Sequence, residues 1–122
     1  MLLPVAHFAF GQGSEKGSLA QFYATPLTIA DKMLELGGLK AGERMFDLGS
    51  GDGRIVILAA QKYKANGTGV ELNPSLVKQS SDRIKQLNLT NSARIIEGDL
   101  LKQDYSSADL ITVYLLPVGN NL

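Results

Sequence analysis

The chain has 122 residues, a length that fits one small domain. Apolar residues make up 44% of it and charged residues 20%, as in folded globular proteins. The formal net charge is zero, so the overall balance favours neither nucleic acid nor an anionic membrane surface as a partner. No apolar run approaches the roughly 20 residues of a membrane span. The absence of cysteine excludes disulfides, thiolate catalysis and sulfur-based zinc sites, and we expect no metal site.

The first segment, 1–21, is expected to be an arm and linker that precede a folded domain over 22–122. Its first eleven residues are mostly apolar and end in a small-x-small pattern, which resembles the end of an export signal. There is no basic start, however, and Pro4 and His7 interrupt the apolar run. An arm that packs on the domain or frays is the alternative. We therefore expect a cytoplasmic protein, or an exported or periplasmic one if the segment is a signal remnant.

Helical and extended patterns alternate along the rest of the chain. Thr25 as N-cap and Pro26 at the first helical position start a helix that ends at a Gly-Gly pair, and Asn73-Pro74 repeats that start signal. The expected order is a helix over 26–37, a strand over 44–48, a helix over 54–63, a strand over 67–72, a helix over 74–87, and strands over 93–97 and 110–116. This alternation predicts an α/β fold with a Rossmann-like, doubly wound parallel sheet, its apolar strands covered on both faces.

The segment 46–54, Phe-Asp-Leu-Gly-Ser-Gly-Asp-Gly-Arg, falls between a predicted strand and a predicted helix. Open α/β sheets bind ligands at the carboxyl ends of strands, where glycines let a ligand approach the backbone. The G-x-G-x-G spacing differs from dinucleotide and phosphate-loop motifs. Asp47 would repel phosphate but suits a cationic aminoacyl sulfonium group. We therefore expect Asp47, Gly49, Ser50 and Gly51 to bind a cofactor; a plain tight turn is the alternative.

Two further acidic residues end predicted strands. Glu71 lies roughly 20 positions after the glycine loop, where a carboxylate commonly accepts hydrogen bonds from a ribose diol. Leu72 and Asn73 follow it and are included in the expected site. The alternative for Glu71 is a solvated carboxylate at a strand end, or one that favours the next helix N-terminus.

The third strand is followed by Gly98, Asp99 and Leu100. Gly98 permits close approach, Asp99 can accept from an adenine amino group, and Leu100 can pack on the ring; the alternative is an ordinary Gly-Asp turn. Because the carboxyl ends of parallel strands share one edge, we expect Asp47, Glu71 and Asp99 at one rim of the sheet.

These motifs resemble those of class I S-adenosylmethionine-dependent methyltransferases. Residues 47–54 resemble motif I, Glu71 the acidic ribose ligand, and 98–100 the adenine-side motif. A narrower resemblance, over about 22–120, is to the mitochondrial-type protein-lysine methyltransferases that modify the ATP synthase c-subunit and the adenine-nucleotide translocase, with their bacterial homologues. The segments that carry it are 24–26, 33–36, 47–57 and 114–117.

The resemblance implies S-adenosyl-L-methionine as cofactor and a protein lysine as substrate. It also implies that Tyr23 and Thr25 close the site from above, and that Tyr114 lines the mouth as the one candidate catalytic residue. A core-edge aromatic is the alternative for Tyr114. Methyltransferases of this class continue through three more strands, so we expect the 110–116 strand to leave an unpaired edge that favours a homodimer.

Two other functions are weighed against methyl transfer. A non-catalytic cofactor-binding fragment, completed by a partner chain or by further strands, would explain the absence of the later strands. An NAD-dependent oxidoreductase would need a different glycine spacing and no acid at position 47. We therefore expect a methyltransferase, with the binding fragment as the alternative.

Overall fold

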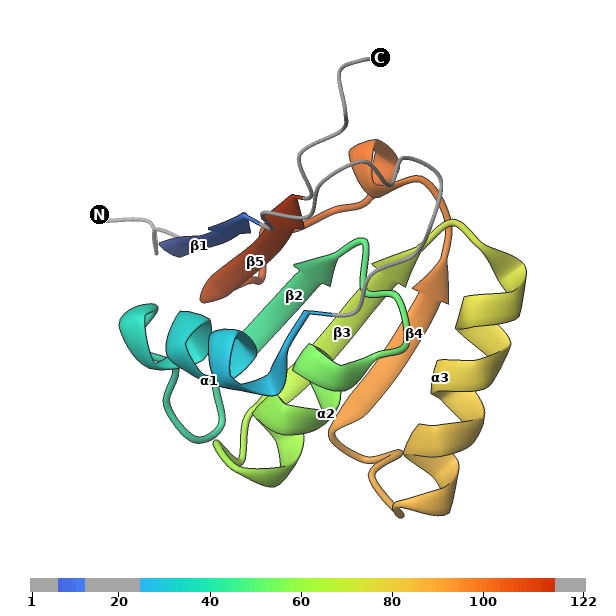
Figure 1. The fold of residues 1–122 in the computed structure, drawn as a ribbon, viewed down its shortest axis with the longest axis horizontal. Coiled ribbons are helices and arrows are strands. Elements are labelled where there is room, and N and C mark those ends of the chain that lie inside the picture. Colours follow the sequence, from blue (N-terminus) through green and yellow to red (C-terminus); the bar gives the residue numbers. More distant parts are fainter. Residues whose placement is uncertain (1–6, 13–24, 116–122) are drawn as a thin grey trace.

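The computed structural model describes residues 7–12 and 25–115, with the side chains of 25–113 (Figure 1). Its elements in chain order are β1 (His7–Gln12), α1 (Leu27–Leu36), β2 (Arg44–Leu48), α2 (Arg54–Gln61), β3 (Asn66–Glu71), α3 (Pro74–Gln86), β4 (Ala93–Glu97), the 3-10 helix η1 (Leu100–Lys102) and β5 (Leu110–Leu115). The elements that the sequence predicts all occur, with bounds that differ by two residues at most. No helix in these ranges combines the length and the apolar character needed to cross a bilayer.

The strands form one parallel sheet in the order β1-β5-β2-β3-β4. From β2 the chain moves outward to β3 and β4, and it then returns to place β5 on the other side of β2. The direction of winding thus reverses between β2 and β5, which confirms the expected doubly wound α/β class. Such a reversal marks the place where open α/β sheets bind ligands.

The outer edge of β5 is paired with β1, in a register that runs from His7 opposite Leu110 to Gln12 opposite Leu115. The expectation of an unpaired edge on this strand is therefore wrong. Sequence patterning missed β1 because its run, His-Phe-Ala-Phe-Gly-Gln, has no regular polar alternation and contains a glycine. A parallel partner distant in the chain supplies the backbone hydrogen bonds that local sequence does not reveal.

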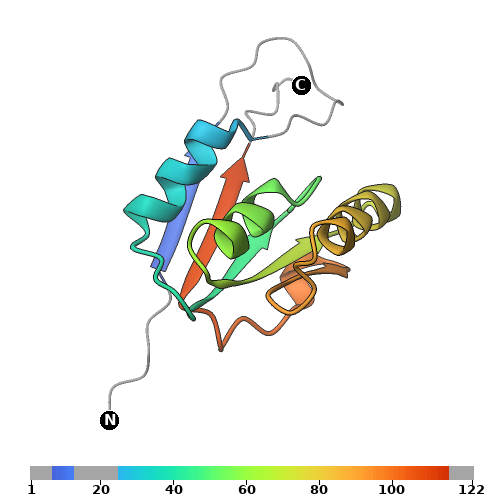
Figure 2. The ribbon, with the colours of Figure 1, turned by 90° about the horizontal axis from the view of Figure 1, so that it is seen from below.

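All three α-helices of the described chain pack on one face of the sheet (Figure 2). Right-handed crossovers that proceed in one direction, from β1 through β2 and β3 to β4, place their helices on the same side. The helix-side core is built from buried residues such as Leu34, Val56, Ile84 and Leu110. The opposite face carries a smaller apolar cluster of Phe46, Val70, Ala108 and Ile111, against which Tyr105 packs. Helical cover on both faces, as expected from the sequence, is not found in the part described.

The two predicted helix starts differ in the structure. Asn73 caps α3, because its side-chain oxygen accepts from the backbone N–H groups of Ser75 (2.9 Å) and Leu76 (3.3 Å). At α1 the N-cap is Pro26, and no side chain caps the helix. The prediction of Thr25 as N-cap is therefore wrong by one residue, and Thr25 is buried instead.

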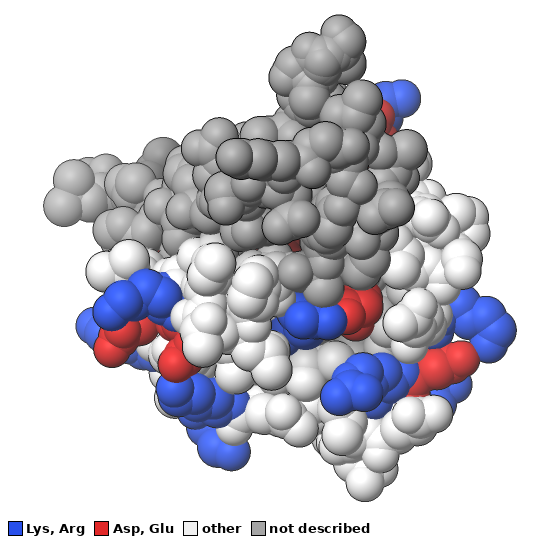
Figure 3. Space-filling view, viewed as in Figure 1, with Lys and Arg blue, Asp and Glu red and all other residues white. Residues whose placement is uncertain are grey.

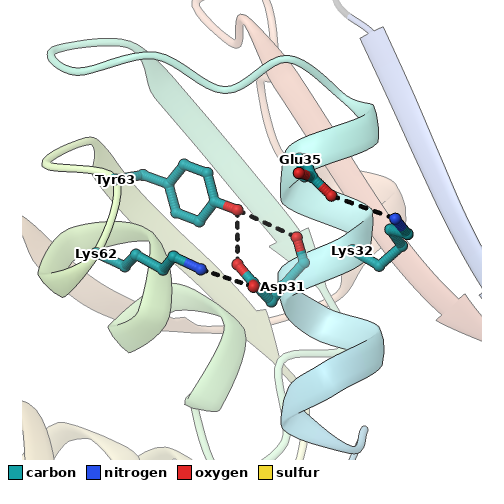
Figure 4. A network of polar contacts seen from close by, with 5 residues as sticks. All are labelled: Asp31, Lys32, Glu35, Lys62 and Tyr63. Carbon is teal, nitrogen blue, oxygen red and sulfur yellow. Dashed lines mark hydrogen bonds and ion pairs between the residues drawn. The ribbon is translucent and has the colours of Figure 1, made fainter.

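A polar cluster fastens α1 to the end of α2 (Figure 4). Asp31 accepts hydrogen bonds from the Lys62 ammonium (2.7 Å) and the Tyr63 hydroxyl (2.6 Å). These two hydrogen bonds lower the pKa of Asp31, while burial and the neighbouring carboxylate raise the pKa of Tyr63 to about 12. The ammonium and the carboxylate are both partly exposed, so the cluster defines the position of α1 more than it stabilises the fold.

We expect Leu34→Ala to lower the free energy of unfolding by about 2 to 5 kcal/mol, because the side chain is completely buried in the helix-side core. Leu36→Ala is the matched control: it removes the same atoms from the same helix at a position that is 77% exposed, and should change stability by about 0.5 kcal/mol or less. Urea unfolding followed by circular dichroism measures both. Equal losses in the two variants would contradict this packing of α1.

Candidate functional site

The loops that follow β2, β3 and β4 meet at one rim of the sheet. The N–H groups of Gly49 and Ser50 donate to the carbonyl of Val70 (2.8 and 3.1 Å), and the N–H of Gly98 donates to the carbonyl of Glu71 (3.0 Å). Backbone hydrogen bonds therefore join the three strand ends laterally. The sequence predicted that these three segments converge, and the structure confirms it.

The glycine loop turns through left-handed backbone conformations. Gly49 has a φ of 74° and Gly51 a φ of 59°, where other residues are strained. A Cβ added at Gly49 would have nothing within 4 Å, so the loop presents open backbone at this point. The chain then enters α2 through Gly53, without a side-chain cap.

Glu71 connects the glycine loop to the start of α3. Its Oε1 accepts from the N–H of Gly51 (2.7 Å) and its Oε2 from the N–H of Asn73 (3.0 Å). A carboxylate offers about four acceptor positions, so each oxygen keeps capacity for one further donor. Glu71 is half-buried, and the carboxylate is thus both a structural link and an acceptor at the rim.

Ser50 lies beneath the loop with an unsatisfied hydroxyl. Its Oγ is buried and has no hydrogen-bond partner among the described residues. A Cβ added at Gly69 would lie 2.5 Å from this oxygen, so only glycine at that position in β3 lets Ser50 lie so close. A buried hydroxyl without a partner costs free energy, so Ser50 is the residue of this loop with an open hydrogen-bonding position.

Asp47 is the buried acid of the site, with 2% of its surface exposed. The Thr112 hydroxyl donates to its Oδ1 (2.7 Å) across the point where the winding of the sheet reverses. Burial raises the pKa of Asp47 to about 7; the hydrogen bond from Thr112 opposes this rise, and the charges of Glu71 and Asp52 add to it. Sequence reasoning missed Thr112, although a lone threonine in the run Leu-Ile-Thr-Val-Tyr-Leu was a usable signal.

Arg54 joins the glycine loop to Thr25, two residues before the start of α1. Its guanidinium donates to both carboxylate oxygens of Asp52 and to the carbonyl of Thr25 (3.2 Å). Burial alone would raise the pKa of Asp52, but the hydrogen bonds and charge of Arg54 outweigh it and lower the pKa. Asp52 and Arg54 stand in the motif, but sequence reasoning gave them no role. The structure places Thr25 next to the loop through its backbone.

The loop that follows β4 places an acid, Asp99, between apolar side chains. Asp99 accepts from the N–H of Leu101 (2.9 Å) through Oδ1 and so caps η1, while its other oxygen has no described partner. Leu72 and Leu100, which follow the neighbouring strands β3 and β4, are 71% and 38% exposed. This part of the rim therefore offers apolar surface beside a carboxylate.

Two predicted site residues lie partly or wholly outside what the structure describes. Tyr23 falls outside the described residues. The backbone of Tyr114 pairs with Gly11 in the sheet, but its side chain is not described. Within the described ranges, no group of three or more His, Cys, Asp or Glu side chains is arranged to hold a metal ion.

The order of strands and the loop at the rim define the class I methyltransferase architecture. A structure of an RNA methyltransferase from Salinibacter ruber, solved in complex with S-adenosyl-L-homocysteine, superposes with a TM-score of 0.75 at 42% identity; it covers 78% of this chain and 62% of that one. The model of the ANTKMT methyltransferase domain matches residues 47–122. The chain belongs to this family.

Curated relatives agree with this assignment. A protein-lysine N-methyltransferase of Saccharolobus islandicus is 31% identical over 102 residues, which are 83% of this chain and 63% of the relative. The human lysine N-methyltransferase of the ATP synthase c-subunit is 40% identical over 73 residues, which are 60% of this chain and 31% of the relative. The chain thus spans between about a third and two thirds of the length of these relatives.

We expect Asp47→Asn to remove a pH dependence from the stability of the protein. The folded pKa of Asp47 is raised above its ordinary value of 3.8, so the protonated carboxyl stabilises the fold below that value, and this contribution is lost as the pH rises through about 7. Between about pH 4 and 7, the unfolding free energy of the wild type should therefore fall relative to that of the variant. Urea unfolding across this range measures the difference; a difference that does not vary with pH would contradict the raised pKa.

Proposed function

We propose that this chain is the cofactor-binding domain, over 22–122, of an S-adenosylmethionine-dependent methyltransferase that acts on protein lysine. The observation that carries the proposal is the rim itself: a buried acid, an unsatisfied buried hydroxyl and a half-buried carboxylate beside an open glycine loop. The names of the relatives from Saccharolobus islandicus and human support lysine as the acceptor.

The residues at the inner part of the rim suit the aminoacyl sulfonium end of this cofactor. A buried carboxyl such as Asp47 gains most from a nearby cation, since the cation offsets the cost of its ionisation. Gly49 presents open backbone that a ligand can approach, Gly51 continues the left-handed turn, and the Ser50 hydroxyl has no described partner. We therefore assign these four residues to that end of the cofactor.

The outer part of the rim suits the adenosine end. Both oxygens of Glu71 keep one acceptor position each, which matches the two hydroxyls of a ribose. We assign the adenine to the exposed Leu72 and Leu100, with Asp99 accepting from its amino group and Gly98 and Asn73 shaping the rim. Burial of these leucines by a flat ring would remove apolar surface from water.

The chemistry that the cofactor supplies is an activated methyl group on a positive sulfur. The described residues then have to position the cofactor, because in-line displacement depends on the alignment of the methyl donor with the acceptor. A lysine acceptor must first lose a proton, which costs roughly 4 to 5 kcal/mol at neutral pH. We propose that Tyr23 and Thr25 close the site from above and that Tyr114 lines its mouth. Thr25 is held beside the loop by Arg54, which supports the first part.

Calorimetry with S-adenosylhomocysteine tests the cofactor site. We expect the wild type to bind with a Kd in the micromolar range or weaker. The affinity should be at least about 10-fold lower in Glu71→Gln, because one carboxylate hydrogen bond is lost. Gly51→Arg should abolish binding, because its backbone is left-handed and faces Glu71. Glu35→Gln, which neutralises an exposed glutamate on α1, should bind as the wild type does. Equal affinities in all four proteins would remove the site assignment.

Incubation with labelled S-adenosylmethionine and lysine-containing peptides tests the reaction. We expect label on lysine that increases as the pH rises from 7 to 9, because the neutral amine is the acceptor. A peptide with arginine in place of lysine is the control and should take up no label. If the chain binds S-adenosylhomocysteine but labels no peptide, the alternative of a non-catalytic cofactor-binding fragment is correct.

RNA is the second candidate acceptor, since the Salinibacter ruber protein at 42% identity is named as an RNA methyltransferase. The same assay with total RNA distinguishes the two acceptors. We rank lysine first because two curated relatives are named for it, and because the net charge of zero does not favour RNA.

A homodimer and a cytoplasmic location complete the proposal. Since β1 occupies the edge of β5, a dimer formed by strand pairing would use the outer edge of β1 or of β4. Sedimentation velocity distinguishes it from a monomer. The cytoplasm is supported by the absence of cysteine, which fits a reducing compartment.

A further inference from the structure

A cavity of about 440 Å³ opens at the end of the sheet away from the rim, where β2, β3 and β4 begin. Its walls include Arg44, Asn66 and Thr68 from two strands, Arg94 from the third, and Ser92 from the turn before β4. Phe46, which belongs to the apolar cluster on the face opposite the helices, also lines it. The cavity is therefore separate from the proposed cofactor site.

Two arginines line this cavity, and no carboxylate is among its lining residues. In the described chain, neither Arg44 nor Arg94 forms an ion pair. Arg94 donates through Nε to the Thr68 hydroxyl (3.3 Å), which holds its side chain against β3. The carboxylate of Asp109 accepts from the backbone N–H of Arg44, and not from its guanidinium.

The register places the two arginines on the same side of the sheet. Arg44 lies opposite Asn66, and Arg94 lies opposite Thr68, two residues further along β3. Side chains two positions apart in a strand point to the same face, and neighbouring strands are about 4.8 Å apart. The long side chains on β2 and β4 thus flank β3 on this face.

The charges of the helix-covered face are arranged differently from those of the cavity, where both charged residues are basic. Basic and acidic side chains are intermixed there (Figure 3). The four ion pairs found among the described residues all join residues of the helices and the loops between them, as in Lys62–Asp31 and Lys78–Asp82. Arg44 and Arg94 belong to none of these pairs, and both line one polar cavity in a chain whose net charge is zero.

We propose that this cavity binds a phosphate group. Guanidinium groups pair with phosphate through two parallel hydrogen bonds. The Thr68 hydroxyl, which accepts from Arg94, can donate to a remaining phosphate oxygen, and so can the second N–H of the Asn66 carboxamide, whose first donates to the Gly42 carbonyl. The proposal does not depend on the methyltransferase function, because the cavity shares no residue with the rim.

Amide NMR spectra recorded during titration with inorganic phosphate test the proposal, with chloride adjusted to keep the ionic strength constant. We expect saturable shifts in the amides of Gly67 and Ser92, and at least a 10-fold higher Kd in Arg44→Gln/Arg94→Gln. Arg83→Gln, which removes one exposed arginine of α3, is the matched control and should keep the wild-type Kd. Absence of saturable shifts, or an unchanged Kd in the double variant, would overturn the proposal.

Two further measurements sharpen the result. Arg44→Lys/Arg94→Lys keeps both charges but loses the paired hydrogen bonds, so it should bind phosphate more weakly than the wild type and more tightly than the glutamine variant. Titration with uridine 5′-monophosphate identifies the source of the phosphate: a Kd at least 10-fold below that of inorganic phosphate supports a nucleotide, and an equal or higher Kd supports free phosphate. Lysine and glutamine variants that bind alike would contradict direct recognition by the arginines.

Discussion

The carboxylate of Glu71 accepts hydrogen bonds from two backbone segments that follow different strands, and the geometry of the rim depends on both. One bond fixes the glycine loop at Gly51 and the other fixes the entry to α3 at Asn73. Charge-assisted hydrogen bonds of this kind are stronger than neutral ones. Because the same oxygens face the rim, one side chain both shapes the site and contributes to it.

Much of the fold followed from local patterns. Apolar runs, turn glycines and the Asn73-Pro74 start located the helices and the strands β2 to β5, and the rule that parallel strands end at one edge brought Asp47, Glu71 and Asp99 together. β1 was missed because its hydrogen-bond partners are distant in the chain, and η1 because a single 3-10 turn has no periodicity. The helix start at Thr25 was wrong by one residue, since the burial of Thr25 depends on tertiary packing.

The site was predictable in its acids and glycines but not in the groups that support them. Thr112 acts on Asp47 through the pairing of β5 with β2, and Arg54 reaches Thr25 across the glycine loop. The first contact depends on strand order and the second on the packing of α1 beside α2, and residue spacing alone specifies neither. The sequence could not predict the proposed phosphate cavity either, because Arg44 and Arg94 are far apart in the chain. Only the register of β2, β3 and β4 brings them to one face.

The pairing of β1 with β5 has a consequence for how the protein acquires its structure during synthesis. The first described strand hydrogen-bonds only to the last one, so it cannot dock until nearly all of the described chain has left the ribosome. The units from β2 to β4 form contacts between neighbours in the chain and can assemble earlier. The nascent domain therefore carries an unengaged strand through most of its translation, a state in which chaperones that bind extended segments can act on it.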